Sequence, residues 1–140
     1  MIFLDTNILI AATLVRHPHN RLSQRLLVEN QSAKTVIAAH TIAEVYSGLT
    51  RLPPPERVAP KVAMAAIEMY LLAMEPVALS SEEYLATVRD AALNGHAGGK
   101  VYDALLLACA RKSGAERIYT WNLRHFQALA PDLAHRILTP

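Results

Sequence analysis

The chain begins with Met1-Ile2-Phe3-Leu4-Asp5-Thr6-Asn7, and this stretch decides the fold. Residues 2–4 form a short run without a polar side chain, which is typical of a strand buried between two layers of helices. Asp5 ends that run, and an apolar pattern at helical spacing resumes at Ile8. Ligands of an open parallel sheet lie beyond the carboxyl ends of its strands, so the carboxylate of Asp5 is a candidate for chemistry.

The composition indicates one folded domain that covers residues 1–140. Hydrophobic residues make up 52% of the chain, which is enough for a core and argues against intrinsic disorder. No apolar run is long enough to span a bilayer and no signal peptide is recognised, so we expect a cytoplasmic protein without a membrane partner. The net charge of +2 permits an anionic partner without requiring one. Cys109, the single cysteine, is expected in the core.

Strands and helices are predicted to alternate along the chain. After the strand at residues 2–4, further strands are expected at 35–39, 77–79, 117–120 and 135–138. Helices are expected over residues 8–15, around 22–27, and over 41–49, 60–74, 80–94, 101–110 and 122–129. This alternation predicts the α/β class, in the form of a single-domain α/β/α sandwich with a mainly parallel central sheet.

Three of the twelve acidic residues differ from the others in their surroundings. Asp5 follows an apolar strand, Glu44 lies among apolar residues of a predicted helix, and Asp103 is surrounded by apolar residues at 101–108. An ionised carboxylate in such surroundings is costly unless it is paired, hydrogen-bonded or bound to a metal ion. If the three carboxylates converge, their mutual repulsion favours a divalent cation, and oxygen ligands suit Mg²⁺ or Mn²⁺. Such an ion activates water against a phosphodiester.

Each acid also has a purely structural interpretation. Asp5 would then only cap the helix that follows it. Asp103 would complement the dipole of the first helical turn, and Glu44 would be exposed on a helix flank. Spacing along the chain does not decide whether the three side chains meet.

Four short motifs in this order resemble those of PIN domains, and the resemblance covers essentially the whole chain. They are Leu4-Asp5-Thr6-Asn7-Ile8-Leu9, then Ala43-Glu44-Val45-Tyr46-Ser47-Gly48-Leu49, then Asp103-Ala104-Leu105-Leu106-Leu107-Ala108, then Thr120-Trp121-Asn122 with His125-Phe126. In size and motif order the chain is most similar to the VapC toxins of bacterial type II toxin–antitoxin pairs. The resemblance implies a PIN-like fold and a metal-dependent endoribonuclease, in which a metal-activated water cleaves RNA.

The resemblance also assigns roles to individual residues. Asp5, Glu44 and Asp103 match the acids that bind Mg²⁺ or Mn²⁺, and Thr6, Asn7 and Thr120 match polar positions that line the same pocket. Asn122 stands where many PIN domains have a further acid. Its carbonyl oxygen can still act as a ligand but adds no negative charge, so Asn122 is expected to contribute weakly and the number of metal ions stays open.

Partners are likewise implied by the resemblance. A VapC-like protein is expected to form a homodimer, to act on RNA, and to be held inactive by a cognate VapB-like antitoxin that places a basic side chain among the acids. Arg16, Lys100 and Arg124 are candidate contacts to RNA phosphates, with solvated helix faces as the alternative interpretation.

Two rival functions remain at this point. A phosphatase of the haloacid dehalogenase type also places an aspartate after an apolar strand, but it needs a second acid where this chain has Asn7. The other rival is a non-catalytic PIN-like module that binds RNA or regulates another protein, with Asn122 as a sign of lost activity. Metal binding and the effect of Asp5→Asn on cleavage would distinguish this module from a nuclease.

Overall fold

The computed structural model describes all 140 residues, and its centre is a five-stranded sheet in which every neighbouring pair is parallel. The strands lie in the order β3-β2-β1-β4-β5. Their bounds are Ile2–Leu4 for β1, Thr35–Ala38 for β2, Met74–Val77 for β3, Arg117–Tyr119 for β4 and Ile137–Leu138 for β5. The predicted parallel sheet is therefore confirmed, and the strand nearest the start of the chain lies in its middle.

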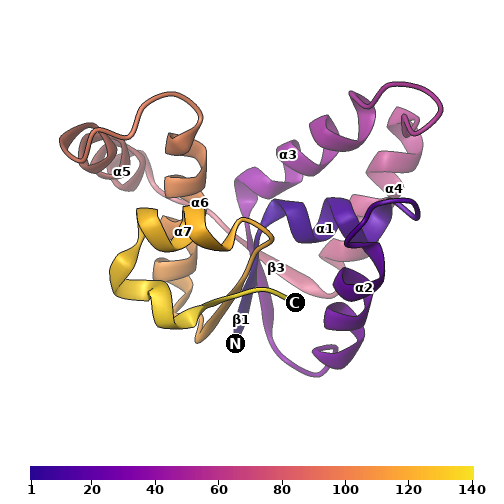
Figure 1. Cartoon of the computed structure of the whole chain (residues 1–140), viewed down its shortest axis with the longest axis horizontal. Helices are drawn as coiled ribbons and strands as arrows, with labels where there is room; N and C mark the ends of the chain where they lie inside the picture. Colours follow the sequence, from indigo (N-terminus) through magenta and orange to yellow (C-terminus); the bar gives the residue numbers. More distant parts are fainter.

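Helices cover both faces of the sheet (Figure 1). One layer consists of α1 (Thr6–Thr13), α2 (Asn20–Glu29), α3 (Ala39–Thr50) and α4 (Pro60–Leu71). The other face is covered by α6 (Lys100–Ser113), α7 (Leu123–Leu129) and the 3₁₀ helix η1 (Pro131–Arg136), while α5 (Ser81–Leu93) packs against α6. The predicted α/β/α sandwich is thus confirmed.

Alternating side chains of β1 explain why this strand lies between the two layers. Phe3 belongs to the core under α6 and α7, whereas Ile2 and Leu4 belong to the core under α1 to α4. All three side chains are at most 1% exposed. A strand with apolar residues on both faces is stable only when both faces are covered. Truncation of Phe3 to alanine would cost about 3–5 kcal/mol of folding free energy.

The prediction for the third strand was wrong in position. We expected a helix through Met74 and a strand at residues 77–79, but α4 ends at Leu71 and β3 is Met74–Val77. The helical spacing of Tyr70, Leu71 and Met74 and the presence of Pro76 concealed the strand. Proline is tolerated here because β3 is an edge strand, so no neighbour needs the missing N–H.

The predictions for the α5 capping box and for Cys109 are confirmed. The Ser80 hydroxyl accepts the Glu83 N–H at 3.1 Å, and the Glu83 carboxylate accepts the Ser80 N–H at 2.6 Å, which completes the capping box of α5. Cys109 is buried in the core, and burial raises the pKa of its thiol to about 11. No helix in the chain combines the length and apolar character that a membrane span requires.

The strand order places the site. The chain leaves β1 toward β2 on one side, whereas β4 pairs on the other side, so the order reverses at β1. The register aligns Leu4 with Tyr119, and the Asp5 N–H donates to the Tyr119 carbonyl at 3.0 Å. The residues that follow these strands, Asp5 and Thr120, are thereby held side by side at the carboxyl edge of the sheet.

Candidate active site

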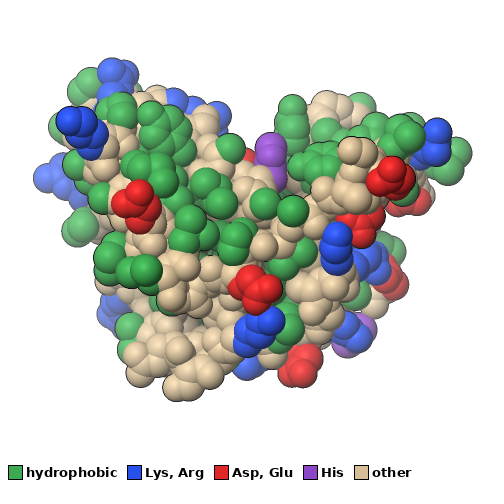
Figure 2. Space-filling view, turned by 180° about the vertical axis from the view of Figure 1, so that it is seen from behind, with side chains coloured by type: hydrophobic (Ala, Val, Ile, Leu, Met, Phe, Trp, Pro, Cys, Tyr) green, Lys and Arg blue, Asp and Glu red, His purple; other side chains and the backbone are tan.

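A cavity of about 540 Å³ lies at this carboxyl edge. The space-filling view shows the molecule hollowed there between two lobes, with acidic and histidine side chains at the bottom (Figure 2). The lining includes Asp5, Thr6 and Asn7 from the start of the chain, Glu44 from α3, Asp103 from α6, and Asn122. The structure therefore brings the three singled-out acids to one cavity, although they are up to 98 residues apart in the sequence (103 − 5).

Asp5 is the most buried of the three acids, with only 3% of its surface exposed. The Thr120 hydroxyl donates a hydrogen bond of 2.6 Å to Asp5 Oδ2. Burial raises the pKa of Asp5 to about 7, and the nearby charges of Asp103 and Glu44 act in the same direction, while the bond from Thr120 opposes them. Burial and like charges disfavour the ionised form, which a bound cation would restore.

Thr120 organises the polar residues around Asp5. Its side chain is fully buried, and its hydroxyl oxygen accepts the Asn122 N–H at 2.9 Å and a longer bond from Asn7 Nδ2 at 3.4 Å. The Asn7 side-chain oxygen accepts the Trp121 N–H at 3.2 Å. The residues Asn7, Thr120 and Asn122, which the motifs suggested as pocket residues, therefore form one hydrogen-bonded group, with Thr120 behind the cavity rather than in its lining.

Glu44 is held by the start of α1. The Thr6 hydroxyl donates to Glu44 Oε2 at 2.5 Å, and Thr6 Oγ1 also lies 3.1 Å from the hydroxyl of the buried Thr41. Thr6 has one hydroxyl proton and gives it to the carboxylate, so Thr41 must be the donor in the second bond. His40 Nε2 lies 3.7 Å from Glu44 Oε1, one helical turn earlier on α3. The Glu44 side chain is 27% exposed, so the interpretation as a freely solvated flank is wrong.

Asp103 lies in the first turn of α6 and is paired with His125 of α7. His125 Nδ1 is 2.9 Å from Asp103 Oδ2. Burial raises the pKa of Asp103 and the charge of Glu44 adds to this, whereas His125 lowers it. Its place in the first turn is consistent with the helix-dipole interpretation as well. For Asp5 the structural alternative is wrong, because its side chain makes no capping hydrogen bond to α1.

The donor set suits a hard divalent cation, but the side chains do not stand ready to hold one. Three carboxylates and an amide oxygen face the cavity, which are the ligand types that Mg²⁺ and Mn²⁺ prefer. As the side chains lie, no group of three His, Cys, Asp or Glu residues is close enough to coordinate one ion. Glu44 is turned to Thr6 and Asp103 to His125, so binding of a cation requires these side chains to rotate.

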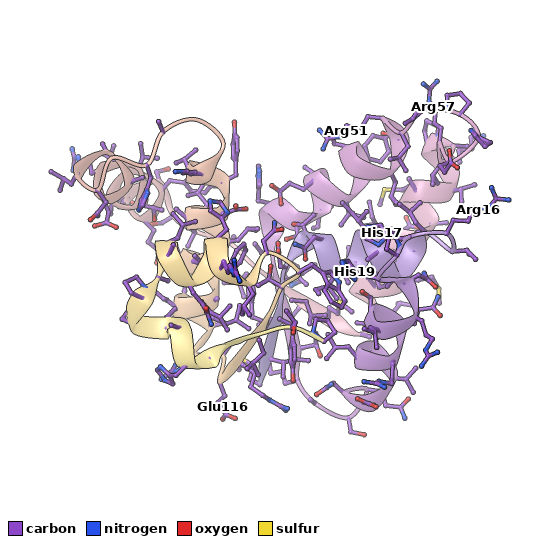
Figure 3. The ribbon with its side chains drawn as sticks, viewed as in Figure 1. Arg16, His17, His19, Arg51, Arg57 and Glu116 are labelled. Atoms are coloured by element: carbon purple, nitrogen blue, oxygen red, sulfur yellow. The ribbon has the colours of Figure 1, made fainter.

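The three predicted phosphate contacts do not line this cavity. Arg16 lies at a separate cavity of about 470 Å³ beside the end of α1, and Figure 3 shows its side chain pointing away from the cleft. Lys100 and Arg124 are exposed at the starts of α6 and α7. The only Lys or Arg in the lining is Arg51, at the end of α3.

Sequence reasoning missed several residues of the lining. His40, Ser47 and Arg51 lie four residues before, three after and seven after Glu44, so they share its face of α3. Tyr102 immediately precedes Asp103 on α6 and also lines the cavity. Helical spacing from Glu44 would have found the first group. Nothing in the sequence around Tyr102 distinguishes it from a core residue.

Comparison with known proteins places this fold and site in a family. The family model of the PIN domain matches residues 2–130. The chain is also 36% identical over 124 residues to Ribonuclease VapC40 of Mycobacterium tuberculosis (strain CDC 1551 / Oshkosh), covering 89% of this chain and 88% of that protein. The chain belongs to the PIN-domain family, among the VapC ribonucleases. The predicted recognition as a VapC-type ribonuclease is therefore confirmed.

Solved structures of other proteins share the fold at low sequence identity. The VapC chain matches Mycobacterium tuberculosis VapC20, described as a toxin that cleaves the sarcin–ricin loop, with a TM-score of 0.75 and 18% identity over 91% of this chain and 95% of that one. It matches VapBC2 from Rickettsia felis, bound to a promoter DNA fragment, with a TM-score of 0.70 and 20% identity over 99% and 98%. FitAB bound to a DNA fragment matches with a TM-score of 0.66 and 22% identity, over 100% of this chain and 95% of that one.

Proposed function

We propose that this VapC ribonuclease is the toxin of a toxin–antitoxin pair and cleaves RNA phosphodiesters in the cavity at the carboxyl end of β1. The observation that carries the proposal is the convergence of Asp5, Glu44 and Asp103 on that cavity. In the proposal these acids are the ligands of Mg²⁺ or Mn²⁺, and residues 1–140 act as one PIN domain. The cation supplies a Lewis acid that lowers the pKa of bound water and offsets the charge developing on the phosphate.

The protein's own groups prepare the site for this chemistry. Thr120 fixes one oxygen of Asp5, Thr6 fixes one of Glu44, and His125 fixes one of Asp103. The bond from Thr120 orients Asp5 as a ligand. The bonds to Glu44 and Asp103 keep these two carboxylates at the cavity, from which they would rotate toward a cation. Because Asp5 is buried beside two other acids, its ionised form is unfavourable without a compensating positive charge.

Asn122 completes the proposed ligand set as a weaker fourth contributor. It is exposed, lines the cavity and is tied to Thr120 through its backbone N–H. Its amide oxygen can ligate a cation but adds no charge, so the site carries three carboxylate charges rather than four. We therefore propose one tightly held cation, since a second would lack a carboxylate of its own.

The proposed partners are an RNA substrate, a second copy of the chain and a VapB-like antitoxin. Support for the antitoxin comes from the related VapBC2 structure, whose name records a VapB–VapC assembly. The acidic cavity also offers a basic side chain three carboxylates that it can neutralise. Co-expression with the small reading frame expected just upstream tests this: copurification and relief of toxicity support the antitoxin, and failure of both contradicts it.

Cleavage of a mixed pool of structured RNA with Mg²⁺ or Mn²⁺ tests the catalytic proposal. Wild type is compared with Asp103→Asn, with an EDTA control, and with Glu82→Gln as a matched change of an exposed acid on α5 outside the cavity. Cuts that require both the metal and Asp103, and that persist in Glu82→Gln, are expected. Cuts that persist in EDTA or in Asp103→Asn would contradict the metal site. No cuts by metal-loaded, antitoxin-free protein would favour a non-catalytic RNA-binding module.

A further inference from the structure

Two aromatic side chains from opposite walls of the cavity stack on each other. Tyr102 of α6 and His40 of α3 have ring centroids 5.6 Å apart and ring planes within 6° of parallel. Both residues line the cavity that contains the three acids. Tyr102 precedes Asp103 and His40 lies one turn before Glu44, so the stacked pair adjoins two of the proposed metal ligands.

The exposure of Tyr102 is unusual for a residue of this size in a cavity. The residue is 51% exposed, and its hydroxyl makes no hydrogen bond within the protein, so it contributes little to the core. The Tyr102 ring stacks on His40 and still leaves about half of the residue's surface exposed. A half-exposed aromatic ring beside a nuclease centre offers a surface on which a nucleobase can stack.

One basic side chain, that of Arg51, lies on the same wall of the cavity as Glu44. Arg51 directly follows α3 as its C-cap, seven residues after Glu44, which places it about two turns and roughly 10 Å further along the same side. It lines the cavity and takes part in no ion pair or side-chain hydrogen bond of the protein. Figure 3 shows Arg51 at the end of α3 beside the cleft, whereas Arg57 extends outward from the loop beyond α3. An unpaired guanidinium at a cavity rim suits a phosphate.

We propose that Tyr102, supported by His40, is the platform for an unpaired base next to the cleaved bond, and that Arg51 binds a flanking phosphate of the same strand. Tyr102 and Arg51 are then substrate-positioning residues rather than catalytic ones. The inference rests on the proposed function, and the base on Tyr102 must be unpaired because a base inside a duplex has no free face for stacking. Stacking of this kind tolerates any base, so Tyr102 selects strandedness rather than sequence.

The test measures equilibrium binding of a fluorescent single-stranded RNA oligomer of mixed sequence by anisotropy, in Mg²⁺ buffer. Every protein carries Asp103→Asn to prevent cleavage during the measurement. The variants are Tyr102→Leu, Tyr102→Phe and Arg51→Gln, with Tyr84→Leu and Arg89→Gln as matched controls on the exposed surface of α5. A fully paired RNA duplex is the second probe, and the salt concentration is varied for both.

Each variant is expected to change RNA binding in a different way. Tyr102→Leu should weaken single-strand binding about 5- to 150-fold without changing the salt dependence, and should leave duplex binding unchanged. Tyr102→Phe should stay within about twofold of the parent, because it keeps the ring. Arg51→Gln should weaken binding and reduce the slope of log Kd against log salt by about 0.7, as expected for the loss of one phosphate contact on a single strand. The two control variants should bind like the parent.

Several results would overturn the inference. If Tyr102→Leu binds single-stranded RNA as well as the parent does, Tyr102 is not a stacking platform. If Tyr102→Leu weakens binding of single-stranded and duplex RNA equally, the substitution acts through the structure and not through stacking. The inference also fails if Tyr84→Leu weakens single-strand binding as much as Tyr102→Leu does, or if the parent protein does not bind the RNA. Cleavage with Asp103 restored separates this outcome from the proposed function: metal-dependent cuts with normal Tyr102→Leu binding reject only the platform, whereas the expected binding pattern without cuts rejects only the catalysis.

Discussion

The inner and outer halves of the cavity are built differently. In the inner half, Asp5 and Thr6, with Thr120 behind them, are less than 9% exposed. Side-chain hydrogen bonds link Thr120 to Asp5 and Thr6 to Glu44, between elements far apart in the chain. In the outer half, the side chains of Arg51 and Tyr102 are exposed and have no hydrogen-bonding partner in the protein. The inner half fixes atoms in place, which chemistry requires, and the outer half leaves groups free for a ligand to engage. Substitutions in the inner half should therefore impair cleavage, and substitutions in the outer half should impair RNA binding.

Replacing Asp5 with asparagine should give the largest effect, because it removes the most buried ligand of the inner half. We expect RNA cleavage to fall about 1000-fold or more, since charge stabilisation by a bound cation is worth several kcal/mol. Single-strand RNA binding should be retained, because the outer half is unchanged. Cleavage rates and binding of the same oligomer measure this difference, and parallel losses of both would contradict the division into two halves.

The pH dependence of stability sharpens the same contrast in metal-free protein. The pKa of Asp5 is raised to about 7 in the folded chain and is near 4 in the unfolded chain. Between these values the unfolded chain has lost a proton that the folded chain keeps, so stability falls as the pH rises from about 4 to about 7 and then levels off. Asp5→Asn should lack this loss, which is on the order of a few kcal/mol.

Urea unfolding in EDTA at pH 5 and pH 8 measures this effect. The wild type should lose stability between the two pH values, and Asp5→Asn should lose distinctly less. Tyr102→Leu, which changes only the outer half, should follow the wild type. The same slope for wild type and Asp5→Asn would show that Asp5 is not the buried acid responsible.

Thr120→Val should have an intermediate effect. Valine fills the space of threonine but removes the hydroxyl that donates to Asp5 and accepts from Asn122. We expect cleavage or metal affinity to fall about 10- to 100-fold, as for other groups that orient a metal ligand. Titration of Mn²⁺ together with cleavage rates checks this, and Thr50→Val, on the exposed end of α3, is the control. Normal metal affinity and normal cleavage by Thr120→Val would show that Thr120 does not support the metal site.

Gly48→Ala should have the smallest effect. An added Cβ would lie 2.5 Å from Ile10 Cδ1, and Ile10 lines the cavity next to Glu44. The end of the Ile10 side chain can move, so the strain is modest, and the gain in helix propensity of about 1 kcal/mol offsets part of it. We expect a melting temperature within a few degrees of the wild type and a few-fold lower cleavage rate. A large loss of stability would show that α1 and α3 cannot separate.

The sequence predicts the inner half of the site better than the outer half. Asp5 follows a short apolar strand, and that local pattern alone places it at the edge of a parallel sheet. Glu44 and Asp103 stand out because charged residues are rare in apolar surroundings. The partners Thr6 and Thr120 were expected in the pocket from the motifs, but their bonds to Glu44 and Asp5 span 38 and 115 residues and have no local signal.

The outer half escapes sequence reasoning for a different reason. Arg51 and Tyr102 belong to the cavity only because α3 and α6 face each other across it, and that relation depends on the packing of whole helices. Arg16, which a basic stretch near the first helix suggested as an RNA contact, lies at another cavity, and its contact with RNA stays a prediction. The position of β3 was missed because Pro76 is acceptable only at a sheet edge, which the local sequence does not reveal.

The pairing of Asp5 with Thr120 has a consequence for the time at which the protein becomes active. The ribosome adds Asp5 115 residues before Thr120. The central strand gains its second neighbour only when β4 has been synthesised, and Asp103 is also made late. A partly synthesised chain therefore lacks the assembled cavity. A toxin built in this order cannot cut RNA until Asp103, β4 and Thr120 have all been synthesised.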